Sequence, residues 1–142
     1  MKGTKLQIGD YVFIKSLYGG YHTTLIKIAA VHQGKVGYHN VPNKLNWVRI
    51  GLLEPIPLTS EILEKNGFKH SATEEDSDYF DNREGDLYYC LNRTADGYMS
   101  CIDVAHSFTI SGLIKYVHEL QHILRLCNLD KLADNLKMEE RL

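Results

Sequence analysis

The sequence lacks a long apolar run, a secretory signal and a cysteine framework. A membrane-spanning helix needs about 20 consecutive apolar residues, and no stretch of this chain approaches that length. The first ten residues carry neither the apolar core nor the cleavage site of a secretory signal. The three cysteines are an odd number without a C-x-x-C pair. We therefore expect a cytoplasmic protein without membrane partners, in which Cys90, Cys101 and Cys127 are reduced.

Most catalytic signatures are also missing. The chain has neither a glycine-rich phosphate loop nor a nucleophile elbow. The triplet His22-Thr23-Thr24 is half of a two-histidine phosphodiesterase site, and no second copy follows. Asp76-Ser77-Asp78 lacks the glycine and the distal glutamate of a calcium loop. These absences favour a protein that is not an enzyme.

Charge divides the 142-residue chain into two parts. Residues 1–58 contain seven basic and two acidic side chains, whereas residues 59–142 contain nine basic and sixteen acidic ones. The change falls at Pro55-Ile56-Pro57, where the prolines also interrupt any strand. We therefore predict two structural units, 1–58 and 59–142.

The first unit has the pattern of a small β-structure. Residues 11–14 are apolar on both faces of a strand, and residues 23–31, 35–38 and 45–53 are further strand candidates. Glycine-containing turns separate them, including Gln33-Gly34. Several short strands within about 55 residues predict a small SH3-like β-barrel.

The second unit has the pattern of a helix, a hairpin and a helix. Residues 59–68 begin with capping residues and end near a glycine, which predicts a short helix. The acid-rich residues 69–86 read as a loop, and the Asp-Gly pair at 96–97 predicts a hairpin between strands 87–91 and 98–104. Residues 112–128 predict the longest helix, followed by a short one to residue 138. The predicted class is α+β.

The longest predicted helix contains an H-E-x-x-H motif. His118 and His122 would be zinc ligands and Glu119 the general base of a zinc-dependent hydrolase. At about 100° per residue, however, both histidines lie opposite the apolar stripe of the helix. The glycine and third ligand of the extended metalloprotease motif are replaced by Arg125 and Asn128. We therefore expect a solvent-exposed helical face without a cofactor, and keep zinc as the alternative.

The positively charged first unit is the better candidate for a binding surface. Basic side chains can contact phosphates while exposed aromatic rings stack on bases. Alternatively, the lysines only keep the unit soluble and the tyrosines fill its core, or the basic unit packs on the acidic one within the molecule or in a homo-oligomer. The candidate residues are Lys15, Lys27, Lys35, Lys44 and Arg49, with Tyr18, Tyr21, Tyr38 and Trp47.

Two segments carry a family resemblance. They are P-I-P-L-T-S-E-I-L-E-K-N-G-F at 55–68 and I-K-Y-V-H-E-L-Q at 114–121. The chain resembles small uncharacterised proteins of Bacteroides-type bacteria, their prophages and mobile elements, in the same order of elements. That resemblance implies an accessory protein of a phage or mobile element, and it does not require the histidine at position 122.

The favoured function is therefore a non-catalytic accessory protein that binds nucleic acid or a host protein through its first unit. Zinc-dependent hydrolysis through His118, Glu119 and His122 is the first alternative. The second is a small-ligand-binding protein with its pocket between the two units.

Overall fold

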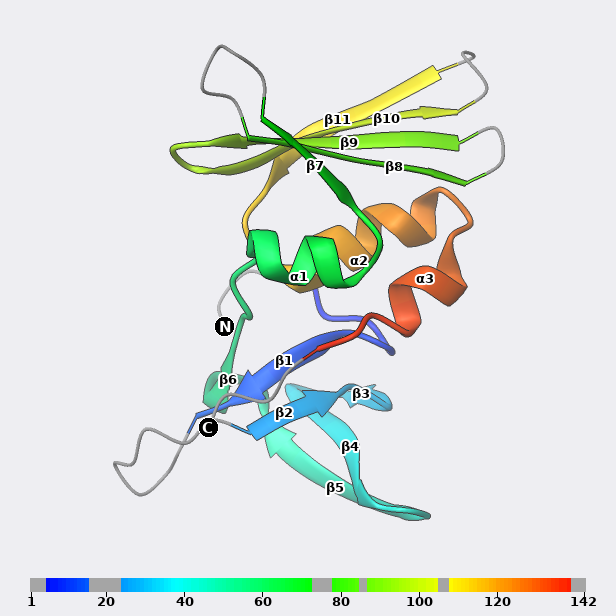
Figure 1. Cartoon of the computed structure of the whole chain (residues 1–142). Helices are drawn as coiled ribbons and strands as arrows, with labels where there is room; N and C mark the ends of the chain where they lie inside the picture. The colour runs from blue at the N-terminus through cyan, green and yellow to red at the C-terminus, as the bar shows by residue number, and fades with distance from the viewer. Residues whose placement is uncertain (1–4, 16–23, 73–77, 85–86, 105–107, 139–142) are drawn as a thin grey trace. The chain divides into compact units, whose positions relative to one another are not determined.

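The computed structural model describes residues 5–15, 24–72, 78–84, 87–104 and 108–138 (Figure 1). It has mixed α+β structure, as predicted. Its contacts form two compact units: unit 1 is Met1–Ile56 with Tyr116–Leu142, and unit 2 is Pro57–Lys115. The first junction between the units, after Ile56, lies at the prolines where the sequence changes from mainly basic to mainly acidic. The last helices group with the N-terminal strands, because the first of these helices packs against the strand at residues 11–14.

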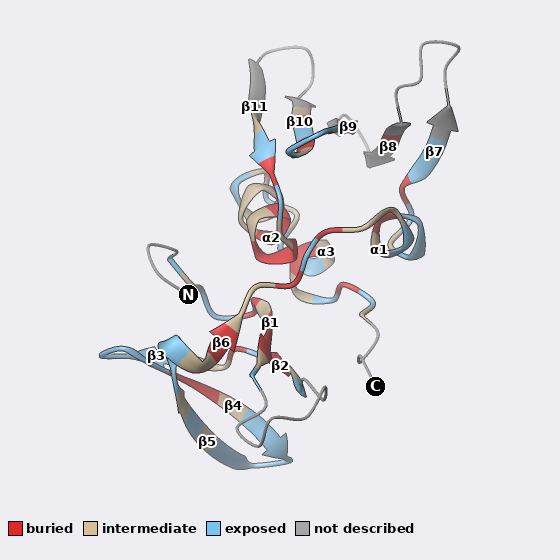
Figure 2. Cartoon of the chain, turned by 90° about the vertical axis from the view of Figure 1, so that its left-hand side faces the viewer, coloured by how far each residue is buried: buried red, intermediate tan, exposed pale blue. Residues whose placement is uncertain are grey.

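The first sheet of unit 1 has the order β2-β1-β6, with antiparallel pairing. Its strands are β1 (Tyr11–Ile14), β2 (Thr24–Lys27) and β6 (Leu53–Glu54). Val12 and Phe13 point to opposite faces of β1, and both are buried, as the apolar pattern on both faces predicts. Figure 2 shows buried residues along β1 and β6.

The second sheet of unit 1 is the antiparallel series β3 (Ala30–His32), β4 (Lys35–Val41) and β5 (Lys44–Arg49). Gln33 and Gly34 turn the chain between β3 and β4 with φ angles of 41° and 77°. Two successive positive φ angles are typical of the hairpin turn whose twist matches the flanking strands. A 3-10 turn, Ile50–Leu52, then leads from β5 into β6.

The predicted closed barrel is wrong: among the described residues the two sheets of unit 1 are open. They share one core, built from Val12, Ile26, Ile28, Val36 and Leu53. The chain changes sheets at a corner, where the Ile28 N–H donates to Asp10 O and the Ala29 N–H donates to Gly37 O. Because this corner separates β2 from β3, the strand pairing does not continue from one sheet into the other.

Two helices complete unit 1. Helix α2 (Val117–Leu126) buries Val117, Leu120 and Leu124, whereas Leu126 on its other side is 72% exposed. It ends at Asn128, whose φ is 61°, and the Leu129 N–H donates to Leu124 O. Helix α3 (Asp130–Asp134) follows, as predicted. None of the described helices is long and apolar enough to cross a membrane.

Unit 2 contains one short helix and a five-stranded antiparallel sheet with the order β11-β10-β9-β8-β7. Helix α1 (Ser60–Lys65) begins at Thr59, whose Oγ1 accepts from the Ile62 N–H, and Gly67 after it has a φ of 88°. Both features match the predicted helix. The buried core residues of unit 2 include Leu63, Phe68, Phe80, Tyr89 and Leu91.

The predicted hairpin is present and longer than expected, as β9 (Leu87–Thr94) and β10 (Gly97–Val104). Cys90 and Cys101 lie opposite each other in it, and neither is bridged.

Two segments of unit 2 differ from the prediction. The predicted loop 69–86 contains β7 (Lys69–Ala72) and β8 (Asp78–Glu84), because Phe80, fully buried, anchors an otherwise polar strand. The start of the predicted helix 112–128 belongs instead to β11 (Phe108–Ile114). Helix α1, the hairpin and the later part of the predicted C-terminal helix, as α2, are therefore present, and α2 groups with unit 1.

Candidate functional site

The three residues of the H-E-x-x-H motif have separate surroundings. His118 is 1% exposed, so the predicted solvent-exposed face is wrong at this position. Its ring stacks on Tyr116, with centroids 5.9 Å apart, and neither ring nitrogen has a hydrogen-bond partner among the described residues. Burial lowers the pKa of His118, and the nearby His122 lowers it further, against the carboxylates of Asp10 and Glu119.

Glu119 and His122 are engaged in contacts within the protein. Glu119 Oε1 accepts from the Tyr116 N–H at 3.0 Å, the contact of an N-terminal capping acid. His122 Nε2 lies 2.7 Å from Asp10 Oδ2. A catalytic zinc needs an open coordination position that water and substrate can reach. The buried His118 and the paired His122 do not fit that requirement, and no group of three metal-ligating side chains occurs among the described residues.

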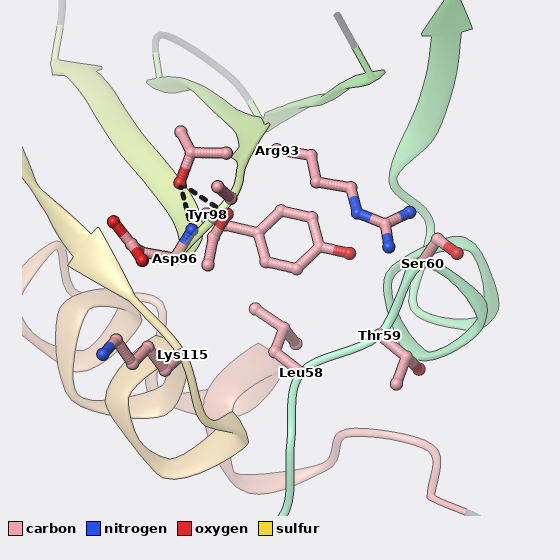
Figure 3. A pocket seen from close by; sticks show the side chains of 10 residues that line it. Leu58, Thr59, Ser60, Arg93, Asp96, Tyr98 and Lys115 are labelled. Carbon is pink, nitrogen blue, oxygen red and sulfur yellow. Dashed lines mark hydrogen bonds between the residues drawn. The ribbon is translucent and has the colours of Figure 1, made fainter.

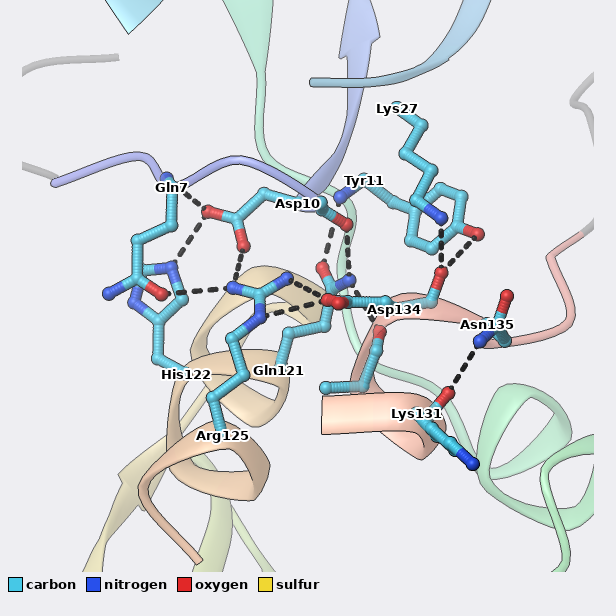
Figure 4. A network of polar contacts seen from close by, with 12 residues as sticks. Gln7, Asp10, Tyr11, Lys27, Gln121, His122, Arg125, Lys131, Asp134 and Asn135 are labelled. Carbon is cyan, nitrogen blue, oxygen red and sulfur yellow. Dashed lines mark hydrogen bonds and ion pairs between the residues drawn. The ribbon is translucent and has the colours of Figure 1, made fainter. Parts of the chain in front are cut away.

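The partner of His122 is a buried carboxylate. Asp10 is fully buried, and its oxygens accept from Arg125 Nη1 at 2.6 Å, from His122 Nε2 and from the Gln7 N–H at 2.8 Å (Figure 4). Arg125 Nε also donates to Asp134 Oδ1 at 3.0 Å. The sequence predicts none of these pairings, since Asp10 and Arg125 are 115 residues apart.

A buried glutamine extends this network. Gln121 Oε1 accepts from the Tyr11 N–H at 2.9 Å, and its Nε2 donates to Gly9 O and Ala133 O at 2.8 Å each. The contacts tie α2 to β1 and to α3. We call Asp10, Gln121, His122, Arg125 and Asp134 the Asp10 network. Because its polar atoms are paired with one another and with backbone groups, its evident role is to hold unit 1 together.

The outward face of β3, β4 and β5 has the opposite character. The strand register places Ala30, Gly37 and Trp47 side by side, and the alternation of side chains puts His32, Lys35 and Arg49 on the same face one step along. We call this surface the Trp47 face. Val36 and Val48, between those rows, point to the core side, which explains why the pattern of burial alternates along β5.

The centre of the Trp47 face is apolar and open. Trp47 is 47% exposed and Leu45 is 39% exposed. A Cβ atom on Gly37 would lie 3.0 Å from Leu45 Cδ1, so the missing side chain gives Leu45 its place over the strand. The His32 ring lies 6.4 Å from the Trp47 ring in an edge arrangement. An exposed aromatic ring flanked by Lys35 and Arg49 can stack on a base while the cations contact phosphates.

The other predicted binding residues lie elsewhere. Lys15 is exposed at the end of β1, and Lys44 is exposed at the β4–β5 turn. Lys27 Nζ donates to the backbone oxygen of Asp134, and Tyr38 packs half-buried against the core. Tyr18 and Tyr21 lie outside the described residues. The structure thus brings together Lys35, Arg49 and Trp47 from the predicted set and adds His32 and Leu45.

Formal charge separates the two units. Unit 1 has eleven basic and seven acidic side chains, a net charge of +4, and unit 2 has five basic and eleven acidic ones, a net charge of −6. The Trp47 face therefore belongs to the positively charged unit, although the whole chain is slightly acidic.

Unit 2 has a hollow of its own, with a volume of about 360 Å³ (Figure 3). Arg93, Asp96 and Lys115 line it together with Tyr98. Thr94 Oγ1, also in its wall, donates to Gly97 O and accepts from the Asp96 N–H. This part of the wall is the hairpin turn, and the contacts of Thr94 serve to hold that turn closed.

Comparison with protein-family models, with curated proteins and with solved structures finds no match for this chain.

Proposed function

We propose that this protein binds single-stranded nucleic acid, without catalysis, through the Trp47 face of unit 1. The observation that carries the proposal is the exposed ring of Trp47 beside Lys35 and Arg49 on one side of a sheet. An exposed indole stabilises a stacked base by about 1–3 kcal/mol, and nearby cations add a term that depends on salt.

A single strand suits this surface better than a duplex. Stacking on Trp47 requires the flat face of a base, which a double helix hides between its neighbours. Beside the ring, Ala30 carries a small side chain and Leu45 lies over Gly37, so the surface next to Trp47 is apolar. We also propose, on the resemblance of the P-I-P-L-T and Y-V-H-E-L-Q segments, that the protein is an accessory factor of a phage or mobile element.

Fluorescence gives a direct test, because Trp47 is the single tryptophan of the chain. Titration with short single-stranded DNA and RNA should quench its emission, and the quenching should weaken steeply as salt is raised. A duplex of the same length should quench less. No quenching by any single strand at low salt would reject the proposal and would favour a host protein as the partner.

Matched variants locate the site. Lys35→Gln should weaken binding measured by anisotropy of a labelled strand, whereas Lys131→Gln, which removes the same charge from an exposed position in α3, should not. Equal effects of the two variants would mean that the net charge of the protein, and not the Trp47 face, determines binding.

A further inference from the structure

We infer that a hollow next to the Trp47 face receives the base that neighbours the stacked one, and that it prefers bases carrying an amino group. This inference rests on the proposed function. The hollow lies in unit 1 and has a volume of about 460 Å³, within the range of small-ligand pockets, roughly 300–1,000 Å³.

The hollow has an apolar wall suited to a flat ring. Ile8, Ile28 and Ala29 contribute to it. Ile28 is 1% exposed, whereas Ile8 is 64% exposed and forms an apolar edge that a bound ring would cover. The exposure of a large aliphatic side chain such as Ile8 to water is unfavourable in free energy, and a base bound in the hollow would cover that side chain.

Two polar side chains in the wall can accept hydrogen bonds. His39 Nδ1 lies 3.2 Å from the backbone oxygen of Lys44. Because a carbonyl oxygen can only accept, Nδ1 carries the hydrogen, and Nε2 of the neutral ring is then an acceptor. The second is the Asp134 carboxylate, which is 40% exposed; Arg125 contacts its Oδ1, so Oδ2 is the oxygen that would accept from a ligand.

The third polar group in the wall is a cation. Lys27 Nζ donates to the backbone oxygen of Asp134 and lies 5.7 Å from the centre of the Tyr11 ring (Figure 4). Among the described residues no carboxylate pairs with this ammonium group, since the Asp134 carboxylate pairs with Arg125. Lys27 is therefore placed to attract the phosphate of a nucleotide whose base occupies the hollow.

The strand register connects the hollow to Trp47. Gly37 is the partner of Trp47, and His39 lies two residues further along β4 on the same face. The step from Gly37 to His39 spans about 7 Å along β4, and Trp47 lies one strand away from it, so ring and hollow are further apart than the spacing of about 3.4 Å between stacked bases. Two neighbouring bases that have been separated from each other would span that distance, one on Trp47 and one in the hollow.

The acceptors in the wall determine the preference. Cytosine and adenine present an amino group that can donate to His39 Nε2 or to the Asp134 carboxylate, whereas uracil and thymine present a carbonyl at the same position. A carbonyl facing these acceptors gains no hydrogen bond and leaves them unpaired. We therefore expect cytosine-containing strands to bind more tightly than uracil-containing ones.

Oligodeoxycytidine and oligodeoxyuridine of equal length are the probes, since their bases have the same size and differ in the amino or carbonyl group at position 4 and in the hydrogen at N3. The wild-type protein should bind the cytidine strand about tenfold more tightly, the effect of one well-placed base contact. His39→Ala should reduce that preference to near one, while the Trp47 quenching amplitude stays the same. His32→Ala is the matched control, because His32 lies beside Trp47 and outside the hollow; it should weaken both strands alike.

The outcomes separate the two proposals. Quenching without a preference for cytidine, or a preference that survives His39→Ala, would overturn the assignment of the hollow and leave the Trp47 face in place. Loss of binding to both strands in His39→Ala, with the fold retained, would likewise overturn the base preference. No quenching by either strand would reject the proposed function and this inference with it.

Discussion

The Asp10 network and the Trp47 face are built from similar residue types in one unit, and they differ in what satisfies their polar groups. In the network, Asp10 is fully buried and accepts from three protein donors. On the Trp47 face, Lys35, Arg49 and His32 are exposed beside an aromatic ring that is 47% exposed. Residue type therefore does not distinguish a structural site from a binding site, whereas saturation of the polar groups by protein partners does. Mutations in the first should change stability, and mutations in the second should change binding.

The largest effect is expected in the Asp10 network. Arg125→Met should lower the free energy of unfolding by about 3–5 kcal/mol, because it leaves a buried carboxylate without its main partner. Urea denaturation followed by circular dichroism measures this change. Arg49→Met makes the same substitution on the Trp47 face and should change stability by less than about 0.5 kcal/mol. Similar losses of stability in both variants would show that the Asp10 network and the Trp47 face do not differ in their contribution to folding.

The next effect is expected at Trp47. Trp47→Ala should weaken binding of single-stranded DNA by about 1–3 kcal/mol, or roughly 5- to 150-fold in the dissociation constant. The free energy of unfolding should fall by less than in Arg125→Met, since 47% of the surface of Trp47 is already exposed to water. Anisotropy measures the first quantity and urea denaturation the second. A large loss of stability would show that the ring belongs to the core instead.

A smaller effect on affinity and a distinct effect on salt dependence are expected at Arg49. Arg49→Gln should reduce the slope of the logarithm of the binding constant against the logarithm of salt concentration by about 0.7, the value for one phosphate contact of a single strand. Lys131→Gln should leave the slope unchanged. An unchanged slope in both variants would place Arg49 away from the phosphates.

The smallest effect is expected in the pH dependence of stability. The unfolded chain takes a proton on His118 near pH 6.5, whereas burial lowers the pKa of this residue in the folded protein. Lowering the pH below about 6.5 therefore favours the unfolded state, and the free energy of unfolding should decrease until the pH reaches the folded pKa. His118→Phe should reduce that decrease relative to wild type, as measured by urea denaturation at several pH values. An identical pH profile would show that His118 keeps its ordinary pKa.

Local sequence patterns were sufficient to predict the turns, caps and strands that depend on a few neighbouring residues. The alternation at 11–14, the Gln33-Gly34 turn, the cap at Thr59 and the Asp96-Gly97 turn all lie where the structure has them. Each of these depends on residues within a few positions of one another. The β8 strand was missed, because the buried Phe80 stands among polar and acidic residues that give no periodic apolar pattern.

Local sequence patterns could not predict which residues surround the candidate site. The helical periodicity placed both histidines opposite the apolar stripe, yet His118 is buried. The buried arc of α2 is wider than its apolar stripe, because Gly9 and Tyr11 at the other end of the chain supply hydrogen-bond partners for the buried Gln121. On the Trp47 face, the register of two hairpins brings together residues that composition had named only as a scattered set, and it separates Tyr38 from them.

The chain leaves unit 1 after Ile56 and returns to it at Tyr116, so unit 2 is an insertion within the sequence of unit 1. During synthesis, Asp10 therefore leaves the ribosome more than a hundred residues before Arg125 and His122, and it stays in water as an unpaired carboxylate until they arrive. Unit 2, by contrast, is continuous and can fold as it emerges. A polypeptide stopped after residue 115 would hold a complete unit 2 and a first sheet with no helix to cover it. The N-terminal strands are therefore synthesised first, and the sheet that they form is the last part of the protein to receive its covering helix.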